Sequence, residues 1–276
     1  MAENLHCGRF VLNAERPLVM GIVNLTDDSF SGDGFGANAV LAINRGLQMV
    51  EQGAHMLDLG AESTRPGAEV VSLQQEVDRL LPVIEGLRYC GVALSVDTSK
   101  PEVMRLAINA GADMINDIAA LSAPGALDIV AASQAAVCLM HMQGTPETMQ
   151  ANPHYVDVVA EVAEFLAERV AAAEIAGIPL NRICVDPGFG FGKTLEHNIE
   201  LLRRLAELRV PGLPLLVGMS RKTMLGLLTG RATAERMPAG IAAHVLAVFR
   251  GARILRVHDV AATRDAMAVV QAVEDY

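Results

Sequence analysis

Short apolar runs alternate with longer amphipathic segments along the whole chain. Each run ends at a polar or glycine-rich corner, and a stretch with helical periodicity follows it. The eight runs that we expect to form strands are residues 18–25, 55–60, 93–98, 114–118, 136–141, 182–186, 215–219 and 254–258. Because strands that alternate with helices form βαβ units around a parallel sheet, this pattern predicts an α/β fold. Eight units favour a closed (β/α)8 TIM barrel, with an open doubly wound sheet as the main alternative.

Helical segments complete this repeat. They are expected near residues 39–52, 73–87, 155–176, 196–208, 223–228 and 237–249, after Pro124, and at the end of the chain to about 273. A further helix carries Pro101 in its first turn, where Thr98 or Ser99 can act as the cap. Residues 6–17 are expected to form a short β-hairpin, with a turn near 13–15, that closes the bottom of the barrel. Since no linker-like tract interrupts the chain, we predict a single domain over residues 1–276.

The composition agrees with buried parallel strands and excludes several classes of function. Apolar residues make up 51% of the 276 residues and aromatic ones only 4%, as expected for strands covered by helices. The net charge of −10 comes without a basic run, so nucleic acid is not an expected partner. No stretch is long and apolar enough for a membrane span or a signal peptide, which predicts a cytoplasmic protein without membrane contact. The four cysteines form no CxxC pair and are expected to be buried thiols.

Most apolar runs end in a side chain that can bind a ligand or carry charge. In a barrel these ends meet at one mouth, where the active sites of this fold lie. The residues are Asn24, Asp58, Glu62, Asp97, Asn116, Asp117, His141, Asp186, Ser220, Arg221, Lys222, Arg256 and His258. Single members could cap helices or tie loops together, but the desolvation of so many convergent polar groups is unfavourable without a ligand. We therefore predict an active site at this mouth.

Several familiar catalytic motifs are absent or incomplete. Residues 186–194 resemble a phosphate-binding loop, but Pro187 stands where that loop needs its first glycine. Lys193 likewise occupies the place of the third glycine in a dinucleotide fingerprint. The histidines lack a metal-binding spacing, and the sequence contains no Gly-x-Ser-x-Gly elbow.

One group of strand-end residues predicts an anion site. Ser220 can cap a following helix, and its hydroxyl and the free N–H groups there would join Arg221 and Lys222 around an anion. Arg256 and His258 alternate with apolar residues, so both should point into the mouth. Together these groups suit a phosphorylated or carboxylated substrate. The alternative is a basic rim that pairs with Asp and Glu side chains.

A second group has the opposite character. Asp97, Asn116 and Asp186 bring two carboxylates and an amide to the same mouth. Such groups recognise an edge with several N–H donors, for example an aminopyrimidinone ring. A buried site of this kind rejects analogues that lack the donors, because its own polar groups then stay unpaired.

At these residues the chain resembles the dihydropteroate synthase family. The segments that carry the resemblance are MGIVN at 20–24, SFS at 29–31, STRPG at 63–67, SVDT at 95–98, ND at 116–117, DPGFG at 186–190, SRK at 220–222 and RVH at 256–258. They follow the family's order and span nearly the whole chain, so their joint occurrence is specific. The resemblance implies a folate-synthesis transferase with a TIM barrel. Its reaction condenses 6-hydroxymethyl-7,8-dihydropterin diphosphate with 4-aminobenzoate to give 7,8-dihydropteroate and diphosphate.

The resemblance also implies a role for each matching position. The pterin would be held by Asp97, Asn116, Asp186 and Lys222. The diphosphate would be bound by Mg²⁺ on Asn24 and by Arg256 and His258. The catalytic residues would then be Lys222, Arg256 and His258. The aminobenzoate site would be formed by Thr64, Arg65, Pro66, Phe191 and Ser220, with the loop around Phe30 closing over it.

Charge separates when diphosphate leaves a CH₂ group on an electron-rich ring. We therefore expect positioning and electrostatic stabilisation, without a covalent enzyme intermediate. The first loop departs from the family pattern, with Asp27 in place of Pro and Gly32–Asp33 in place of Asp-Gly, which predicts a looser loop. The resemblance further implies a homodimer built on outer helices, and the apolar segment 241–249 is compatible with this.

Two other functions fit parts of the same pattern. A pterin-binding methyltransferase domain would share the barrel and the Asp/Asn pocket, but it would work with a corrinoid partner and would not need the diphosphate contacts. A non-catalytic pterin-binding protein would keep the pocket without turnover. The segments at 63–67 and 220–222 favour the synthase over the methyltransferase.

Overall fold

A closed parallel barrel forms the centre of the molecule. The computed structural model describes residues 4–25, 35–62, 71–208 and 212–274. The barrel strands are β3 (Leu18–Asn24), β4 (Met56–Gly60), β5 (Ala93–Asp97), β6 (Met114–Asp117), β7 (Ala136–Met140), β8 (Ile183–Asp186), β9 (Leu215–Val217) and β10 (Ala252–Val257). Each strand pairs in parallel with the next, and β10 pairs with both β9 and β3. This closure confirms the TIM barrel and excludes the open sheet.

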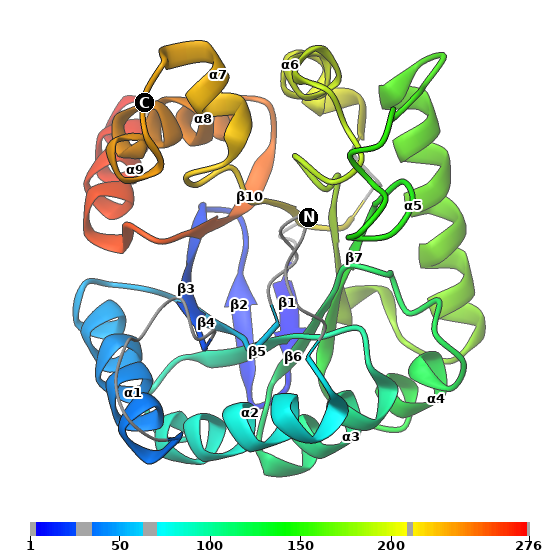
Figure 1. Ribbon diagram of the computed structural model, residues 1–276, viewed down its shortest axis with the longest axis vertical. Coiled ribbons are helices and arrows are strands. Elements are labelled where there is room, and N and C mark those ends of the chain that lie inside the picture. Colours follow the sequence, from blue (N-terminus) through cyan, green and yellow to red (C-terminus); the bar gives the residue numbers. More distant parts are fainter. Residues whose placement is uncertain (1–3, 26–34, 63–70, 209–211, 275–276) are drawn as a thin grey trace.

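A ring of helices surrounds the barrel (Figure 1). Its members are α1 (Phe35–Glu51), α2 (Leu73–Leu87), α3 (Pro101–Ala110), α4 (Ala126–Ala131), α5 (Val158–Ile175), α6 (Leu195–Arg203), α7 (Thr223–Thr229), α8 (Met237–Phe249) and α9 (Val260–Glu274). Short 3-10 turns lie at Leu180–Arg182, Leu205–Leu208 and Thr233–Glu235. Within the described ranges, no helix is both long and apolar enough to cross a membrane.

The start of α3 differs from the sequence prediction. Neither Thr98 nor Ser99 caps this helix, because its N-cap is Lys100, which makes no side-chain capping bond. The Thr98 hydroxyl instead accepts a hydrogen bond from the backbone N–H of Lys100 at 3.3 Å. Pro101 sits at the first helical position, where its missing N–H and fixed φ are tolerated, so the cap falls on the residue directly before it.

Alternation along the strands separates the interior of the barrel from its outer face. On β3, Met20 belongs to the inner cluster, whereas Val19 and Val23 belong to the larger cluster between the strands and the helices. The inner cluster is apolar and lies toward the amino ends of the strands, with Met56, Ala93, Met114, Ala136, Cys138, Cys184, Leu216 and Ile254. Because side chains on a strand alternate, the next inward positions toward the carboxyl ends are those that carry the polar side chains.

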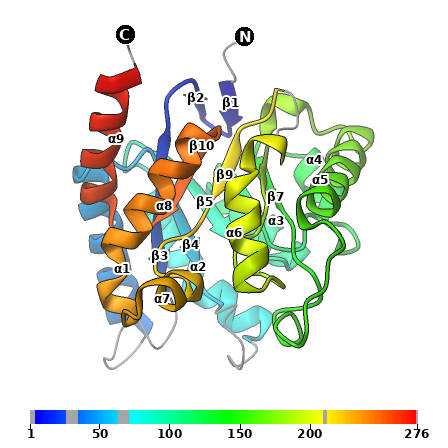
Figure 2. The same ribbon diagram turned by 90° about the horizontal axis from the view of Figure 1, so that it is seen from above.

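The N-terminal hairpin closes the bottom of the barrel, as predicted. Its strands are β1 (Asn4–Cys7) and β2 (Phe10–Asn13), and Figure 2 shows them at the end of the molecule opposite α7. Leu5 and Cys7 are fully buried in the inner cluster, so the hairpin seals the barrel with apolar side chains.

The predicted position of the hairpin turn is wrong. The strands reverse at Gly8 and Arg9, where Gly8 has φ +53°, a conformation that favours glycine. The segment 13–15 does turn, since Asn13 Oδ1 accepts a hydrogen bond from Glu15 N at 2.8 Å, but this turn leads from β2 toward β3. Asn13 is a residue type that favours turns, and the sequence analysis placed the turn there. The glycine at position 8 favours a turn as well, but it was not chosen.

Candidate active site

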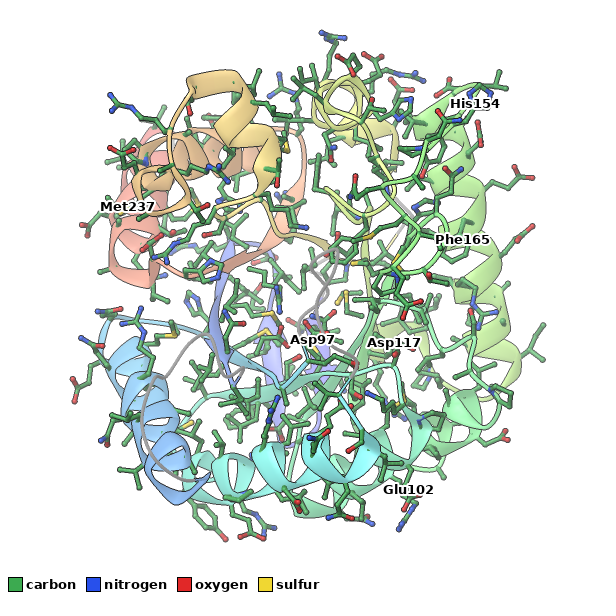
Figure 3. All side chains as sticks on the ribbon, viewed as in Figure 1. Asp97, Glu102, Asp117, His154, Phe165 and Met237 are labelled. Atoms are coloured by element: carbon green, nitrogen blue, oxygen red, sulfur yellow. The ribbon has the colours of Figure 1, made fainter. Side chains whose placement is uncertain are left out.

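Inward polar side chains gather at the carboxyl ends of the barrel strands. Asp97 ends β5 and is in register with Asn116 on β6, while Asp186 ends β8 in register with Met140. Figure 3 shows Asp97 in the middle of the ring of helices. Lys222 interacts electrostatically with Asp186, Arg256 and Asp97. The structure therefore brings together the residues that the sequence assigned to a ring-binding pocket.

Arg256 joins this pocket through two carboxylates. Its Nε donates to Asp58 Oδ2 at 2.5 Å and its Nη2 to Asp97 Oδ2 at 2.7 Å. Asp58 is fully buried, and Asn116 Nδ2 donates to the same Oδ2 atom at 3.1 Å. The sequence treated Arg256 and Asp97 as members of separate sites, but in the structure they form one ion pair.

Burial changes the proton affinity of the pocket. It raises the pKa of Asp97 to about 7, and Arg256 opposes this shift while Asp58 adds to it. Burial also raises the pKa of Asp186, with Lys222 opposing, and lowers the pKa of Lys222 to about 8, with Asp186 opposing. Shifts of this kind toward neutral pH are common at binding and catalytic sites.

Lys222 lies between the end of β9 and the loop that follows β8. Its ammonium group donates to the carbonyl oxygen of Phe189 and lies 4.4 Å from the centre of the Phe191 ring, as a cation–π contact. Asp186 Oδ1 accepts from Gly188 N at 2.7 Å, which fixes the start of the same loop. The segment 186–191 thus carries an acceptor, an aromatic face and the support for a lysine.

Lys193, the lysine of the segment that resembles a phosphate-binding loop, makes its contacts within the protein. Its side chain turns into the protein and donates to the carbonyl oxygens of Gly188 and Phe191, each at 3.0 Å. Its third contact is His141 Nδ1 at 2.9 Å, and burial lowers the pKa of His141 to about 3, so the ring is neutral and can accept. His141, which had no role in the sequence prediction, therefore supports this loop.

Ser220 does not act as a helix cap, which corrects the sequence prediction. Helix α7 has Lys222 as its N-cap without a side-chain capping bond. Ser220 Oγ instead lies 3.0 Å from His258 Nδ1 and accepts from His258 N at 3.3 Å. Arg221 has φ +61° in the turn after Ser220, and this turn delays the helix start to Thr223. The structure thus gives Ser220 a contact with His258 in place of a helix N-terminus.

Arg221 and Asp117 also differ from their expected settings. Arg221 Nη2 pairs with Asp259 Oδ1 at 2.7 Å. The sequence analysis gave such pairing of a basic residue with an acidic one as the alternative to an anion site, and at Arg221 the structure shows this alternative.

Asp117 lies two residues after Ile115, so its side chain points, like that of Ile115, away from the barrel interior. Its carboxylate accepts from Ala119 N and Leu121 N at 2.8 and 2.7 Å. Burial raises the pKa of Asp117 to about 6. Its role is to tie the loop after β6.

Asn24 is the protein donor that the sequence assigned to Mg²⁺. Asn24 ends β3, in register with Gly60, and its side chain is half-buried. Because it lies four residues after Met20 on the same strand, its side chain points into the barrel as that of Met20 does. In the described part of the chain, no group of three or more His, Cys, Asp or Glu side chains could hold a metal ion. Mg²⁺ often takes only one or two protein oxygens and completes its shell with substrate phosphates and water. A single amide oxygen at the mouth therefore fits an ion that arrives with a diphosphate.

Part of the predicted aminobenzoate site lies outside the described residues. This applies to Phe30, Thr64, Arg65, Pro66 and the unusual positions Asp27, Gly32 and Asp33. Glu62 is described, and its Oε1 accepts from Val71 N at 3.1 Å. Its Oε2 and the buried Glu76 both accept from Lys100 Nζ at 2.6 Å. Glu62 therefore links β4, the start of α2 and the region before α3.

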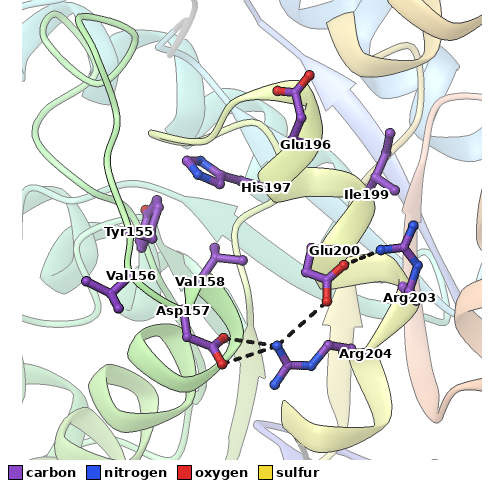
Figure 4. Close-up of a pocket in the computed structure, with 10 residues that line it drawn as sticks. All are labelled: Tyr155, Val156, Asp157, Val158, Glu196, His197, Ile199, Glu200, Arg203 and Arg204. Carbon is purple, nitrogen blue, oxygen red and sulfur yellow. Dashed lines mark hydrogen bonds and ion pairs between the residues drawn. The ribbon is translucent and has the colours of Figure 1, made fainter.

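A separate pocket of about 580 Å³ lies outside the barrel, between the start of α5 and α6 (Figure 4). Its lining residues are Tyr155, Val156, Asp157, Val158, Glu196, His197, Ile199, Glu200, Arg203 and Arg204. Arg204 bonds to Asp157 at 3.1 Å, and Asp157 caps α5. Because these charged groups serve helix capping and surface ion pairs, we place the active site at the barrel mouth.

Comparisons with known proteins point to one family. The model of a family described as pterin binding enzyme matches residues 20–258. The dihydropteroate synthase of Escherichia coli strain K12 is 50% identical over 262 residues, which cover 95% of this chain and 93% of that relative.

Solved structures give the same result. The Xanthomonas albilineans dihydropteroate synthase with 4-aminobenzoic acid has a TM-score of 0.93 and 51% identity, with 100% of both chains covered. The Burkholderia cenocepacia dihydropteroate synthase complexed with 7,8-dihydropteroate has a TM-score of 0.90 and 49% identity, covering 99% of this chain and 96% of that one.

Proposed function

The chain belongs to the family of pterin-binding enzymes, among its dihydropteroate synthases, and from this premise we propose how its side chains carry out the reaction. The substrates are 6-hydroxymethyl-7,8-dihydropterin diphosphate and 4-aminobenzoate, and the products are 7,8-dihydropteroate and diphosphate. The observation that supports these roles is the cluster of Asp97, Asn116, Asp186 and Lys222 at the barrel mouth beside Arg256.

The pterin ring binds inside the mouth. Asp97 and Asp186 accept hydrogen bonds from N–H groups of the ring, and the Asn116 amide adds a donor and an acceptor. Lys222 supplies an ammonium group that is already held by the Phe189 carbonyl oxygen. Because Asn116 and Asp186 are buried, and Asp97 and Lys222 are half-buried and held by hydrogen bonds, little ordering is needed when the ring enters.

The diphosphate lies above the ring, toward Asn24, Arg256 and His258. Mg²⁺ held by Asn24 and the diphosphate would neutralise charge on the leaving group. Arg256, near the end of β10, and His258, directly after that strand, contact the diphosphate and hold it in line with the bond that breaks. When that carbon–oxygen bond breaks, the electron pair leaves with the diphosphate, and the Arg256 guanidinium and the His258 ring stabilise the charge that develops.

The second substrate approaches from the side of Ser220 and Phe191. With His258 N and Nδ1 as donors to Ser220 Oγ, the Ser220 hydroxyl donates its own hydrogen to the carboxylate of 4-aminobenzoate. Thr64, Arg65, Pro66 and Phe30 belong to the same site in this proposal. The amine nitrogen attacks the CH₂ carbon as diphosphate departs and then loses a proton. Because the attacking nitrogen comes from the substrate, the enzyme contributes orientation and electrostatics, without a covalent bond to a side chain.

A product assay tests this function. The purified chain is mixed with the pterin diphosphate, 4-aminobenzoate and Mg²⁺, and 7,8-dihydropteroate and diphosphate are measured over time. We expect both products in equal amounts and none when either substrate is left out. A folded protein that binds pterin but forms no dihydropteroate would rule out the synthase and favour the non-catalytic alternative.

A further inference from the structure

Asp58 lies one layer below the residues that form the ring pocket. It is an inward position of β4, in register with Ile22 and Ser95, whereas Gly60 two residues later is in register with Asp97. The Asp58 side chain is fully buried, in a barrel interior that is otherwise apolar toward the bottom. A carboxylate at this depth needs a specific reason, because its desolvation is strongly unfavourable.

The contacts of Asp58 reach two pocket residues through one oxygen. Oδ2 accepts from Arg256 Nε at 2.5 Å and from Asn116 Nδ2 at 3.1 Å. Oδ1 is buried and has no hydrogen-bond partner among the described residues. Unpaired buried polar atoms are uncommon in native proteins. If position 58 only had to fill space in the barrel, an apolar side chain would stabilise the fold at least as well as this carboxylate.

The bond to Asp58 decides which way the Asn116 amide faces. Because Asp58 Oδ2 accepts from Asn116 Nδ2, the NH₂ group of Asn116 points toward Asp58 and its carbonyl oxygen points away from it. One of the two hydrogens on Nδ2 is used in this bond. The carbonyl oxygen and the second N–H are then the groups that Asn116 offers to a ligand.

We propose that Asp58 is a positioning residue that determines specificity for the pterin ring. It fixes the Asn116 amide so that an acceptor and a single donor face the pocket, and it holds Arg256 beside Asp97. The ring edge selected in this way carries an N–H donor next to a nitrogen acceptor, as a 2-aminopyrimidinone does. This inference rests on the proposed function, because it assumes that the pterin binds at Asn116.

The test substitutes Asp58→Asn, which keeps the size of the side chain and removes its charge. We expect the KM for the pterin diphosphate to rise at least tenfold and the KM for 4-aminobenzoate to stay within twofold. Direct titration with 6-hydroxymethylpterin, which lacks the diphosphate, should show the same loss of affinity. If the affinity for this ring stays within twofold of wild type, the inference is wrong.

Asp113→Asn provides a matched control for a buried carboxylate that pairs with arginine. Asp113 is 1% exposed, and its Oδ2 accepts from Arg9 Nη2 at 2.7 Å and from Leu94 N at 3.0 Å, at the bottom of the barrel. We expect this variant to lower Tm without changing either KM by more than twofold. If it raised the KM for the pterin as Asp58→Asn does, the effect would be one of general stability and the inference would fail.

A double variant separates positioning from folding. Asp58→Asn with Asn116→Asp restores a hydrogen bond between the two positions with its direction reversed. Position 116 then presents a carboxylate, which has no N–H to offer. We expect Tm to recover toward the wild-type value while the affinity for 6-hydroxymethylpterin stays at least tenfold weaker. Recovery of both quantities would contradict the proposal.

The wild-type enzyme keeps the two levels of inference apart. If wild type forms dihydropteroate and the Asp58 variants bind pterin normally, the role of Asp58 is refuted and the function stands. If wild type forms no product, the proposed function fails. The double variant remains informative even where the single variant does not fold, because positions 58 and 116 still hold one carboxylate and one amide between them.

Discussion

The alternation of side-chain directions along each strand predicted the pocket residues that lie at strand ends. Asp97, Asn116 and Asp186 each follow an apolar run, and strand parity places them inside the barrel. Their partners could not be predicted in the same way. Arg256 and Asp58 are 198 positions apart, and only the closure of β10 on β3 brings them to 2.5 Å. The sequence assigned no role to Lys193 for a related reason, because its contact with His141 joins two different βα units.

The raised pKa of Asp97 predicts that pterin binding depends on pH. Since the ionised carboxylate accepts the N–H groups of the ring, affinity should fall as the pH drops below about 7, by up to about tenfold per unit. Titration of 6-hydroxymethylpterin between about pH 5.5 and about pH 8.5, a range that brackets this pKa, measures the dependence. Asp97→Asn should bind weakly at every pH. A wild-type affinity that is flat across this range would contradict the prediction.

The same group affects stability in the opposite direction. A carboxyl whose pKa is raised by folding keeps its proton longer in the folded state than in the unfolded state. Its contribution to stability is therefore complete below its ordinary pKa and is lost as the pH rises through about 7. Urea denaturation measures the unfolding free energy of wild type and of Asp97→Asn. As the pH rises from about 5 to about 8, wild type should lose stability relative to the variant. This range lies between the pKa of an ordinary Asp and a value just above that of Asp97. An unchanged difference would show that Asp97 does not titrate there.

At the scale of elements, the loop after β8 depends on one buried lysine. Lys193→Met would leave the carbonyl oxygens of Gly188 and Phe191 without their donor. We expect the free energy of unfolding to fall by about 3 kcal/mol and the KM for the pterin to rise, because the same loop carries Asp186. Urea denaturation and steady-state kinetics measure both. Arg203→Met, at a side chain that is 65% exposed, should change neither quantity appreciably.

The hairpin turn offers a second test at this scale. A Cβ atom at Gly8 would lie 2.6 Å from Asp113 Oδ1 and 2.8 Å from Asp113 Cα, and Gly8 has φ +53°. Gly91→Ala is the control, since Gly91 has φ +88° but no heavy atom within 4 Å of the added Cβ. We expect Gly91→Ala to lower stability by about 1 kcal/mol and Gly8→Ala by about 2 kcal/mol more. Equal effects in thermal unfolding would show that the contact with Asp113 relaxes without penalty.

For the whole molecule, the sequence was sufficient for the barrel and insufficient for its details. Strand and helix periods predicted the repeat, and the closed order β10-β3-β4-β5-β6-β7-β8-β9 confirms it. The caps of α3 and α7 and the position of the hairpin turn were predicted wrongly, because each depends on a residue whose backbone angle or missing N–H outweighs the side-chain signal. Pro101, Arg221 and Gly8 are these three residues.

The homodimer remains a prediction for the whole molecule. Helices α8 and α9 pack on each other and expose Leu246, Phe249, Val269 and Val273 by 46 to 66%. Phe249→Glu should shift the molar mass measured by light scattering from that of two chains to that of one, because a charge at an apolar interface stays unpaired. Val156→Glu, beside α5 across the barrel from α8 (Figure 1), should leave the mass unchanged. A single-chain mass for wild type would contradict the dimer.

The central claim is that the inward polar side chains at the barrel mouth bind the pterin ring. Calorimetric titration of 6-hydroxymethylpterin into wild type and Asp97→Ala tests this claim most directly. We predict one binding site per chain in wild type and no measurable binding in the variant, with a circular dichroism spectrum that shows an intact fold. Binding of the ring to folded Asp97→Ala with wild-type affinity would contradict the account.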